Sequence, residues 1–240
     1  MSETRTALVT GANKGIGYEI AAQLGRLGFR VGVGSRNGGR GGAAVSKLRA
    51  EGVDAFAVPL DVTDDESVAA AATLLEEQGA LDVLVNNAGI SAGRLQTPSA
   101  TDLDRIRAAV ETNVIGVVRV TNALLPLLRR SSSARIVNVS TSMASLALNR
   151  TSAPGSGPLD GAYGPSKTML NAVTLQYARE LEGTGVLVNL VCPGYVATDF
   201  TGFDGGRTPA QGAAIAVKLA TVPDGGPHGG FFDEAGELPW

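Results

Sequence analysis

Short apolar runs alternate with longer segments of helical period along nearly the whole chain, and no other feature constrains the fold as strongly. Most of the runs are apolar at consecutive positions, as expected of strands that helices cover on both faces. This alternation predicts an α/β fold in which βαβ units build a doubly wound parallel sheet with helices on both faces. The expected strands are 6–10, 30–35, 54–60, 81–87, 134–140, 185–191 and 229–232. The expected helices are 15–28, 40–51, 64–78, 100–129, 160–182 and 208–221.

The composition excludes several other classes of protein. Of the 240 residues, 44% are hydrophobic and 18% are charged, which is typical of a globular protein and not of a disordered one. A net charge of −3 argues against a protein built mainly to bind nucleic acid. The single cysteine, Cys192, and the single histidine, His228, cannot form a structural zinc site without carboxylates, so no metal is expected. We see neither a signal peptide nor a run of about 18 apolar residues, and we expect a soluble, cytoplasmic protein with no membrane partner.

A glycine-rich turn follows the first expected strand and precedes the first expected helix. Its sequence, GANKGIG at 11–17, places glycines at Gly11, Gly15 and Gly17. Glycine lets the backbone approach a pyrophosphate closely, and a helix N-terminus offers free N–H groups and a positive potential. The spacing differs from the G-x-G-x-x-G fingerprint but allows the same contacts. We therefore expect a single-domain, Rossmann-type fold over 1–240 that binds a dinucleotide.

Two cations indicate which dinucleotide binds. Arg36 follows the second strand, where an acidic residue would favour a free ribose 2′-hydroxyl, and Lys14 lies in the glycine loop. Two cations that converge on one phosphate favour NADP(H) over NAD(H). At the end of the third strand, Asp61 and Val62 are expected to flank the adenine, although Asp61 can also be an ordinary turn residue.

Tyr163 and Lys167 are spaced for chemistry on a helix. They are four residues apart, so they lie on one face about a turn from each other. A free tyrosine has a pKa near 10, and a lysine ammonium close to it favours the phenolate. Such a tyrosine can protonate a carbonyl oxygen while hydride reaches the carbon, or act as the base in the reverse reaction.

Six motifs occur in a fixed order: GANKGIG (11–17), NNAG (86–89), ETNVIG (111–116), VNVSTS (137–142), YGPSK (163–167) and PGYVATD (193–199). Together they resemble the short-chain dehydrogenase/reductase family over nearly the whole chain. GANKGIG, Arg36 and the ending GGFFDEAGELPW are most similar to its carbonyl-reductase-like, NADPH-preferring branch. The resemblance implies reversible, NADPH-dependent reduction of a ketone or aldehyde to an alcohol.

The resemblance also implies roles for single residues. Tyr163 is expected to be the general acid and Lys167 to hold the nicotinamide ribose. Asn113 is expected to position a water behind the lysine, or else to be a helix residue bonded to backbone. Asn87 is expected to border the cofactor or to brace the sheet. The expected cofactor-binding residues are Gly11, Asn13, Lys14, Gly15, Ile16, Gly17, Arg36, Asp61, Val62, Asn87, Ala88, Gly89, Tyr163, Lys167, Pro193, Gly194, Val196 and Thr198.

The hydroxyl that orients the substrate has two candidates. Members of the family usually have two serines after the VN motif, and the second of them orients the substrate. Here the second position is Thr141, whose hydroxyl can donate and accept as serine does. Ser142 takes this role only if the strand ends one residue later or bulges. Ser140 points to the other face and is expected to pack against or bond to the next strand.

The sequence leaves the substrate and the assembly open. Substrate contacts are expected from 91–99, 143–148 and 199–207, which hold no cluster of charge, so an uncharged small carbonyl compound is favoured. The segment before Tyr163 leaves homodimer, homotetramer and monomer possible. We expect 1–140 mainly to bind cofactor and 141–240 mainly to supply catalytic and substrate-binding residues. The alternative is a non-catalytic NADP-binding redox sensor or regulatory protein.

Overall fold

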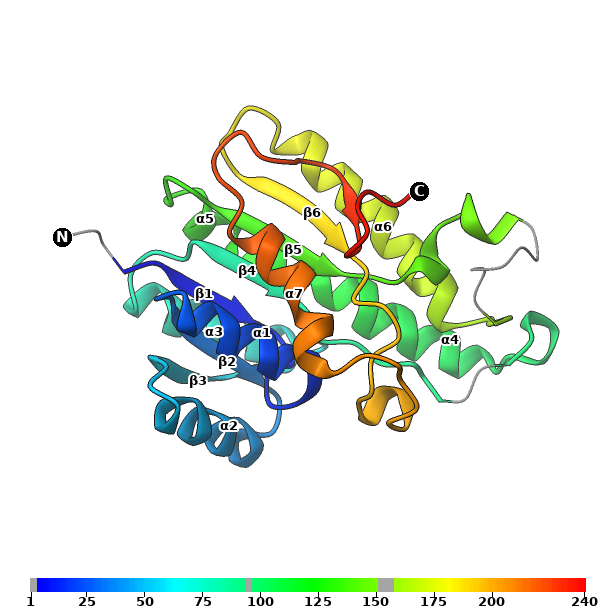
Figure 1. The fold of residues 1–240 in the computed structure, drawn as a ribbon, viewed down its shortest axis with the longest axis horizontal. Coiled ribbons are helices and arrows are strands. Elements are labelled where there is room, and N and C mark those ends of the chain that lie inside the picture. Colours follow the sequence, from blue (N-terminus) through cyan, green and yellow to red (C-terminus); the bar gives the residue numbers. More distant parts are fainter. Residues whose placement is uncertain (1–3, 94–95, 151–157) are drawn as a thin grey trace.

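A seven-stranded parallel sheet forms the centre of the computed structural model, which describes residues 4–93, 96–150 and 158–240 (Figure 1). The strand order is β3-β2-β1-β4-β5-β6-β7, and every neighbouring pair is parallel. The predicted doubly wound α/β fold is therefore confirmed. The strands are β1 (Thr6–Val9), β2 (Arg30–Ser35), β3 (Ala55–Pro59), β4 (Val83–Asn86), β5 (Arg135–Val139), β6 (Leu187–Val191) and β7 (Phe231–Phe232).

Helices cover both faces of this sheet. One core cluster joins α1, α2 and α7 to one face, and a second joins α3, α5 and α6 to the other (Figure 1). The helices are α1 (Gly15–Arg26), α2 (Gly38–Ala50), α3 (Asp65–Glu77), α4 (Leu103–Val110), α5 (Gly116–Leu128), α6 (Tyr163–Glu180) and α7 (Pro209–Ala220). Residues 94–95, in the expected substrate loop 91–99, and residues 151–157, in the segment before Tyr163, lie outside the described residues.

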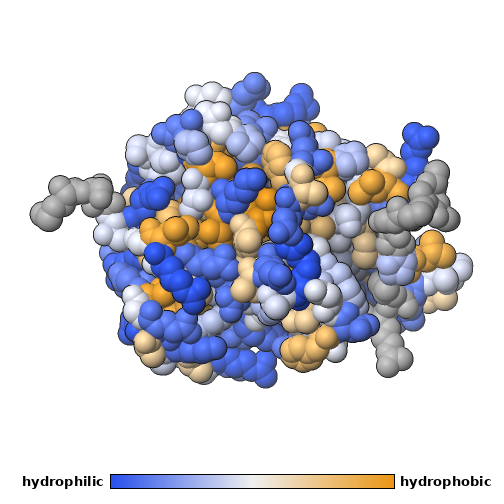
Figure 2. All heavy atoms as spheres, viewed as in Figure 1, coloured by the Kyte–Doolittle hydropathy of each residue, from blue (hydrophilic) through white to orange (hydrophobic). Residues whose placement is uncertain are grey.

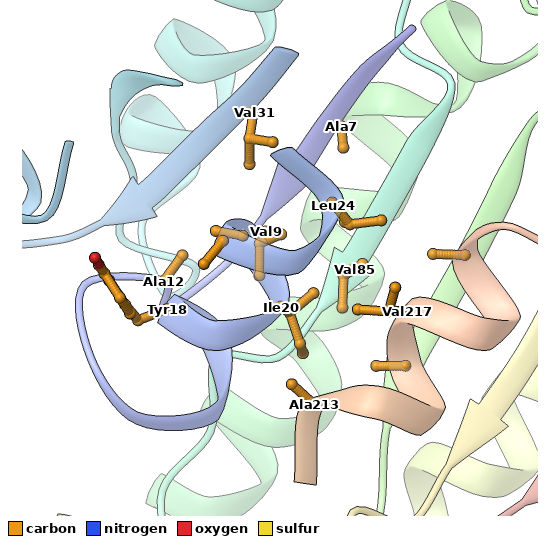
Figure 3. Packing of buried hydrophobic residues seen from close by; sticks show 14 of the residues in the cluster. Ala7, Val9, Ala12, Tyr18, Ile20, Leu24, Val31, Val85, Ala213 and Val217 are labelled. Atoms are coloured by element: carbon orange, nitrogen blue, oxygen red, sulfur yellow. The ribbon is translucent and has the colours of Figure 1, made fainter. Parts of the chain in front are cut away.

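The packing of α1 and α7 on the sheet fixes the glycine loop in space. Ile20 and Leu24 of α1 are fully buried, and they lie among side chains of β1, β4 and α7 (Figure 3). Outside this core the surface is mixed, with apolar patches among hydrophilic residues on the face drawn in Figure 2. The start of α1 is therefore held rigidly at the carboxyl end of β1.

The chain reverses its direction of winding at β1. β1 pairs with β2 on one side and with β4 on the other. In open α/β sheets a crevice forms outside the carboxyl ends of the strands at such a switch point. The loops after β1 and β4 are therefore the expected place for a ligand.

A buried chain of polar side chains ties helices to strands beside this point. Asn86 donates to Asn138 Oδ1 at 2.8 Å and to Thr121 Oγ1 of α5 at 3.2 Å. Asn138 donates to Thr174 Oγ1 of α6 at 2.8 Å. Because buried amides without partners are costly, this chain fixes α5 and α6 relative to β4 and β5.

The expected helix 100–129 is interrupted in the middle. Between α4 and α5 lies one π-helical turn, Glu111–Ile115, so the whole helical stretch runs from Leu103 to Leu128. This stretch is long and apolar enough to cross a membrane, but half of its most apolar window is buried inside the protein. Core helices pass the same test of length and composition. The π-turn matters more for function, because such turns often occur at functional sites.

Candidate active site

The glycine loop passes very close to the loop after β4. Gly11 has φ +66°, and a Cβ placed on it would lie 3.0 Å from the Cα of Ala88. A Cβ on Gly17 would lie 2.4 Å from the Nδ2 of Asn87, which itself donates to the carbonyl of Thr10 at 2.9 Å. The loop after β4 therefore forms one wall of the glycine turn. Asn87 braces it, as one of its two expected roles required.

The N-terminus of α1 is open toward this crevice. Lys14 is the N-cap residue, and its side chain makes no capping hydrogen bond to the helix. The first N–H groups of a helix lack intrahelical partners, so they suit a bound phosphate. The ammonium of Lys14 forms an ion pair with Asp199 instead. Ile16, also in the loop, is partly buried and packs against the hydrophobic core.

A cavity of about 700 Å³ lies beside the loop. Three of its lining residues are basic, Lys14, Arg40 and Lys47, and two are acidic, Glu19 and Asp199. Since the basic residues are in excess, the cavity suits an anionic group. The other residues that line it are Asn13, Gly15, Tyr18, Ala43, Ala44 and Pro209.

Arg36 does not line this cavity. Hydrogen bonds from Thr63 lower the pKa of Asp61, and the charge of Arg36 lowers it further. Asp61 accepts from the backbone and hydroxyl of Thr63 at 3.0 and 2.7 Å, as a turn residue does. The cations that share the cavity with Lys14 are therefore Arg40 and Lys47.

Arg40 and Lys47 were missed in the sequence, although a signal was present. They lie in α2 seven residues apart, a spacing that returns to the same helix face after two turns. Only the position of α2 beside the glycine loop reveals that this basic face lines the cavity.

Tyr163 is the first residue of α6, at the carboxyl edge of β5 and β6. Its ring lies 5.2 Å, centroid to centroid, from the ring of Phe200, which the sequence had not singled out. Burial raises the pKa of Tyr163, and the nearby Cys192 and Asp160 raise it further. The direction is opposite to the one expected from Lys167. In the protein alone the phenol is therefore a proton donor at neutral pH.

Lys167 lies one turn farther along α6 and is buried. Its Nζ donates to the carbonyl of Val139, the last residue of β5, at 2.8 Å. A Cβ placed on Gly89 would lie 3.5 Å from this Nζ and 3.1 Å from the Oδ1 of Asn113. Burial lowers the pKa of Lys167 to about 8. The structure thus brings Lys167, Gly89 and Asn113 together, as the motifs predicted.

Asn113 lies in the π-turn and is fully buried. Its Oδ1 accepts from the backbone N–H of Ile90 at 2.8 Å, and its Nδ2 donates to the carbonyl of Ile90 at 2.9 Å. Nδ2 also donates to Ser166 Oγ at 3.0 Å. Asn113 is therefore bonded to backbone, but to the loop after β4 and not to its own helix. It connects that loop to α6.

The hydroxyls after β5 have three different surroundings. Ser140 bonds to the next strand, β6, through its backbone N–H and the carbonyl of Val191, as expected. Its hydroxyl donates to Asn171 Oδ1 of α6 at 2.6 Å, a partner that was not expected. Thr141 Oγ1 accepts from the N–H of Met143 at 3.3 Å. Ser142 donates its N–H to the sulfur of Cys192 at 3.2 Å.

Residues after β6 approach the glycine loop from the opposite side. Pro193 and Gly194 come after Cys192 at the end of the strand, and Gly194, with φ +78°, borders a second cavity of about 340 Å³. Val196 is buried against α7, where its Cγ2 would lie 2.5 Å from a Cβ on Gly212. Thr198 lies 3.4 Å from a Cβ placed on Gly15. Of these four expected residues, Val196 has the clearest packing role.

These residues suit a dinucleotide phosphate. An open helix N-terminus, a glycine turn too tight for a Cβ at Gly17 and a cavity with excess positive charge occur at one sheet edge. Lys167 and Tyr163 lie at the same edge. Lys167 bonds to the last residue of β5, and Tyr163 is the first residue of α6.

Comparisons with known proteins agree with this arrangement. A sequence profile described as short chain dehydrogenase matches residues 5–205. Carbonyl reductase (NADPH) 1 of Sus scrofa is 35% identical over 279 aligned positions, which cover 100% of this chain and 95% of the relative. Salutaridine reductase from Papaver somniferum has a TM-score of 0.84 at 31% identity and covers 96% of this chain and 99% of its own. A Pseudomonas aeruginosa RhlG/NADP active-site complex has a TM-score of 0.84 at 30% identity, with coverages of 96% and 94%.

Proposed function

The chain belongs to the short chain dehydrogenase family, and on this premise we propose that it uses NADPH to reduce a ketone or aldehyde to an alcohol. The proposal covers the reverse oxidation as well. One observation carries it: Lys167, Asn113 and Gly89 meet beside the glycine loop, with Tyr163 one helical turn from Lys167. A lysine and an asparagine buried together at a ligand-binding sheet edge are costly to stability, and a chemical role explains them.

The proposed reaction joins one hydride and one proton to the carbonyl group. When bound, NADPH would supply the hydride to the carbonyl carbon. Tyr163 would give its phenolic proton to the carbonyl oxygen; burial raises its pKa, so the phenol is protonated but needs a nearby cation to release its proton. The Lys167 ammonium, on the same helix face, would stabilise the phenolate left behind. Asn113 would hold the loop that carries Gly89 against Lys167.

The cofactor preference is part of the proposal. Lys14, Arg40 and Lys47 line the cavity beside the glycine loop, and a 2′-phosphate is the group that distinguishes NADPH from NADH. Two of the similar proteins support the same cofactor, since one is a carbonyl reductase (NADPH) and the other is a complex with NADP. Asn13, Gly15 and Thr198 would border the phosphates.

The division of labour is also proposed. Residues 1–140 would bind most of the cofactor, and 141–240 would supply the acid, the lysine and the substrate contacts. Some residues cross this boundary: Asn113 belongs to the first part, whereas Asp199 and Pro209 of the second part line the cofactor cavity. A small carbonyl compound as substrate and a cytoplasmic location complete the proposal.

The test is oxidation of NADPH with a panel of ketones and aldehydes. The absorbance of the reduced nicotinamide is used to monitor the reaction. Tyr163→Phe should lower kcat about 1000-fold, since a positioned general acid contributes roughly 100- to 10,000-fold. The variant should still bind NADPH. Tyr177→Phe is the matched control, because Tyr177 is a buried tyrosine of the same helix whose hydroxyl bonds to Asn122 at 2.7 Å.

Two results would contradict the proposal. One is a Tyr163→Phe variant that turns over as fast as the wild type. The other is tight NADPH binding by the wild type without turnover of any carbonyl compound, which would favour the redox sensor.

A further inference from the structure

Arg119 of α5 contacts three separate segments with one guanidinium group. Its Nη1 donates to the carbonyl of Val62 at 2.8 Å, and its Nη2 donates to Glu111 Oε1 at 3.0 Å. Its Nε pairs with Asp65 at the start of α3. The side chain is only 19% exposed. A planar guanidinium with all three nitrogens engaged has little freedom to reorient.

The first segment is the loop that ends β3. Val62, expected at the adenine, is buried, and the helix that carries Arg119 packs directly on it. A Cβ placed on Gly116 would lie 2.9 Å from Val62 Cγ2 and 3.1 Å from the Val62 carbonyl. The position of Val62 therefore depends on α5, and Arg119 holds its carbonyl in place.

The second segment is the π-turn. Glu111 is its first residue, and Asn113 lies two residues later. A π-turn has a wider backbone than the helix around it, so the direction of its side chains depends on how its ends are anchored. Arg119 anchors the first residue, whereas Asn113 bonds to Ile90 and Ser166 on the far side.

We propose that Arg119 is a positioning residue. It fixes both the loop after β3, which holds Val62 on the adenine side, and the π-turn that holds Asn113. Its guanidinium lies between Val62, on the cofactor side, and Glu111, two residues from Asn113. Loss of this group should therefore weaken NADPH binding and slow the chemical step at once. The inference rests on the proposed function, because Asn113 matters for rate only if the chain catalyses carbonyl reduction.

A second arginine provides a matched control. Arg130 follows α5 and pairs with Glu76 near the end of α3 at 3.2 Å, so it joins the same two helices as Arg119 and Asp65. It contacts neither Val62 nor Glu111. If the only role of Arg119 were to hold α3 against α5, then loss of Arg119 and loss of Arg130 should have the same effect on NADPH binding and kcat.

The experiment compares Arg119→Met, Arg119→Lys and Arg130→Met in the full chain. NADPH dissociation constants come from calorimetry, kcat and KM from carbonyl reduction, and folding from thermal unfolding. Arg119→Met should raise the dissociation constant and lower kcat, each about tenfold, within the range of coupling effects. Arg130→Met should change neither more than about twofold, as for an exposed ion pair. Arg119→Lys should give intermediate values, because an ammonium cannot make all three contacts.

Two further variants test the contacts of Arg119 with Glu111 and with Asp65 separately. Glu111→Ala should lower kcat and shift its pH profile more than it raises the NADPH dissociation constant. Asp65→Ala should raise the NADPH dissociation constant more than it lowers kcat. Both keep Arg119, so they test the inference even where Arg119→Met fails to fold.

The inference is overturned if Arg119→Met and Arg130→Met change NADPH binding and kcat equally. It is also overturned if Glu111→Ala and Asp65→Ala have the same pattern of effects. Failure of the proposed function looks different, because the wild type would then turn over no carbonyl compound at all. NADPH binding to the Arg119 variants would still test the adenine-side half.

Discussion

The glycine loop (11–17) and the segment after β6 (193–207) meet at the same sheet edge but are fixed in different ways. In the loop, backbone geometry restricts the residue type: Gly11 has a positive φ, and Gly17 leaves no room for a Cβ. In the segment, Gly194 and Gly205 are restricted in the same way, but distant side chains add contacts, such as Phe200 with Tyr163 and Asp199 with Lys14. Restrictions of the first kind are visible in a sequence, whereas pairings of the second kind are not.

The largest expected effect is on stability, and the experiment replaces one glycine in each region. Gly17→Ala should destabilise the fold by about 3 kcal/mol, the upper end for overpacking, because the new Cβ would meet Asn87 and the carbonyl of Gly11. Gly206→Ala is the control, since a Cβ there has open space around it and no positive φ opposes it. Denaturant unfolding measures both. Equal stability of the two variants would break the comparison.

The next test concerns the substrate-orienting hydroxyl. Thr141→Ala should lower kcat about 100-fold, as removal of one donor to a developing oxyanion does, whereas Ser142→Ala should lower it less than threefold. Thr141 is the aligned position, and Ser142 is the alternative. Steady-state kinetics with one ketone decide between them, and the reverse order of effects would assign the role to Ser142. Two fully active variants would remove the role altogether.

Lys167→Met should abolish turnover and yet stabilise the protein by about 2 kcal/mol at pH 7, because a buried charge is removed. The folded lysine releases its proton near pH 8, whereas the unfolded one holds it to about 10.5. Between these values the unfolded state binds more protons, so the free energy of unfolding of the wild type rises with pH. The difference from Lys167→Met should therefore shrink from pH 8 to 10.5. A wild type that loses stability over this window would contradict the assignment.

The smallest expected effect separates the basic residues near the cofactor cavity. Arg40→Ala should weaken NADPH binding about tenfold and NADH binding little, since a charge-assisted hydrogen bond contributes roughly 1.5 to 3 kcal/mol. Arg36→Ala should have a smaller effect, because Arg36 does not line the cavity that Arg40 lines. Calorimetry with both dinucleotides measures this. An equal loss of NADPH affinity in both variants would restore the expectation that Arg36 contacts the phosphate.

The hydroxyls after β5 show where prediction from the sequence ends. Strand alternation placed Ser140 on the face away from Thr141, and helices were expected on both faces, but the sequence could not say which helical residue meets Ser140. Asn171, the partner of Ser140, comes from α6, 31 residues later. The same limit applies to the direction of the Tyr163 pKa, because burial is a property of the assembled fold.

The sequence alone was enough to predict the order of the strands and helices, the glycine turn and the placement of Tyr163 and Lys167 one turn apart on a single helix. These follow from local rules: apolar periodicity, the space that only glycine leaves, and the four-residue turn of a helix. Three features could be seen only in the folded protein. These are the cations that share the cavity with Lys14, the hydrogen bonds of Asn113 to the loop after β4, and the contacts of Arg119 with two parts of the site. Those contacts join residues far apart in the chain, and their geometry exists only after the helices have packed on the sheet.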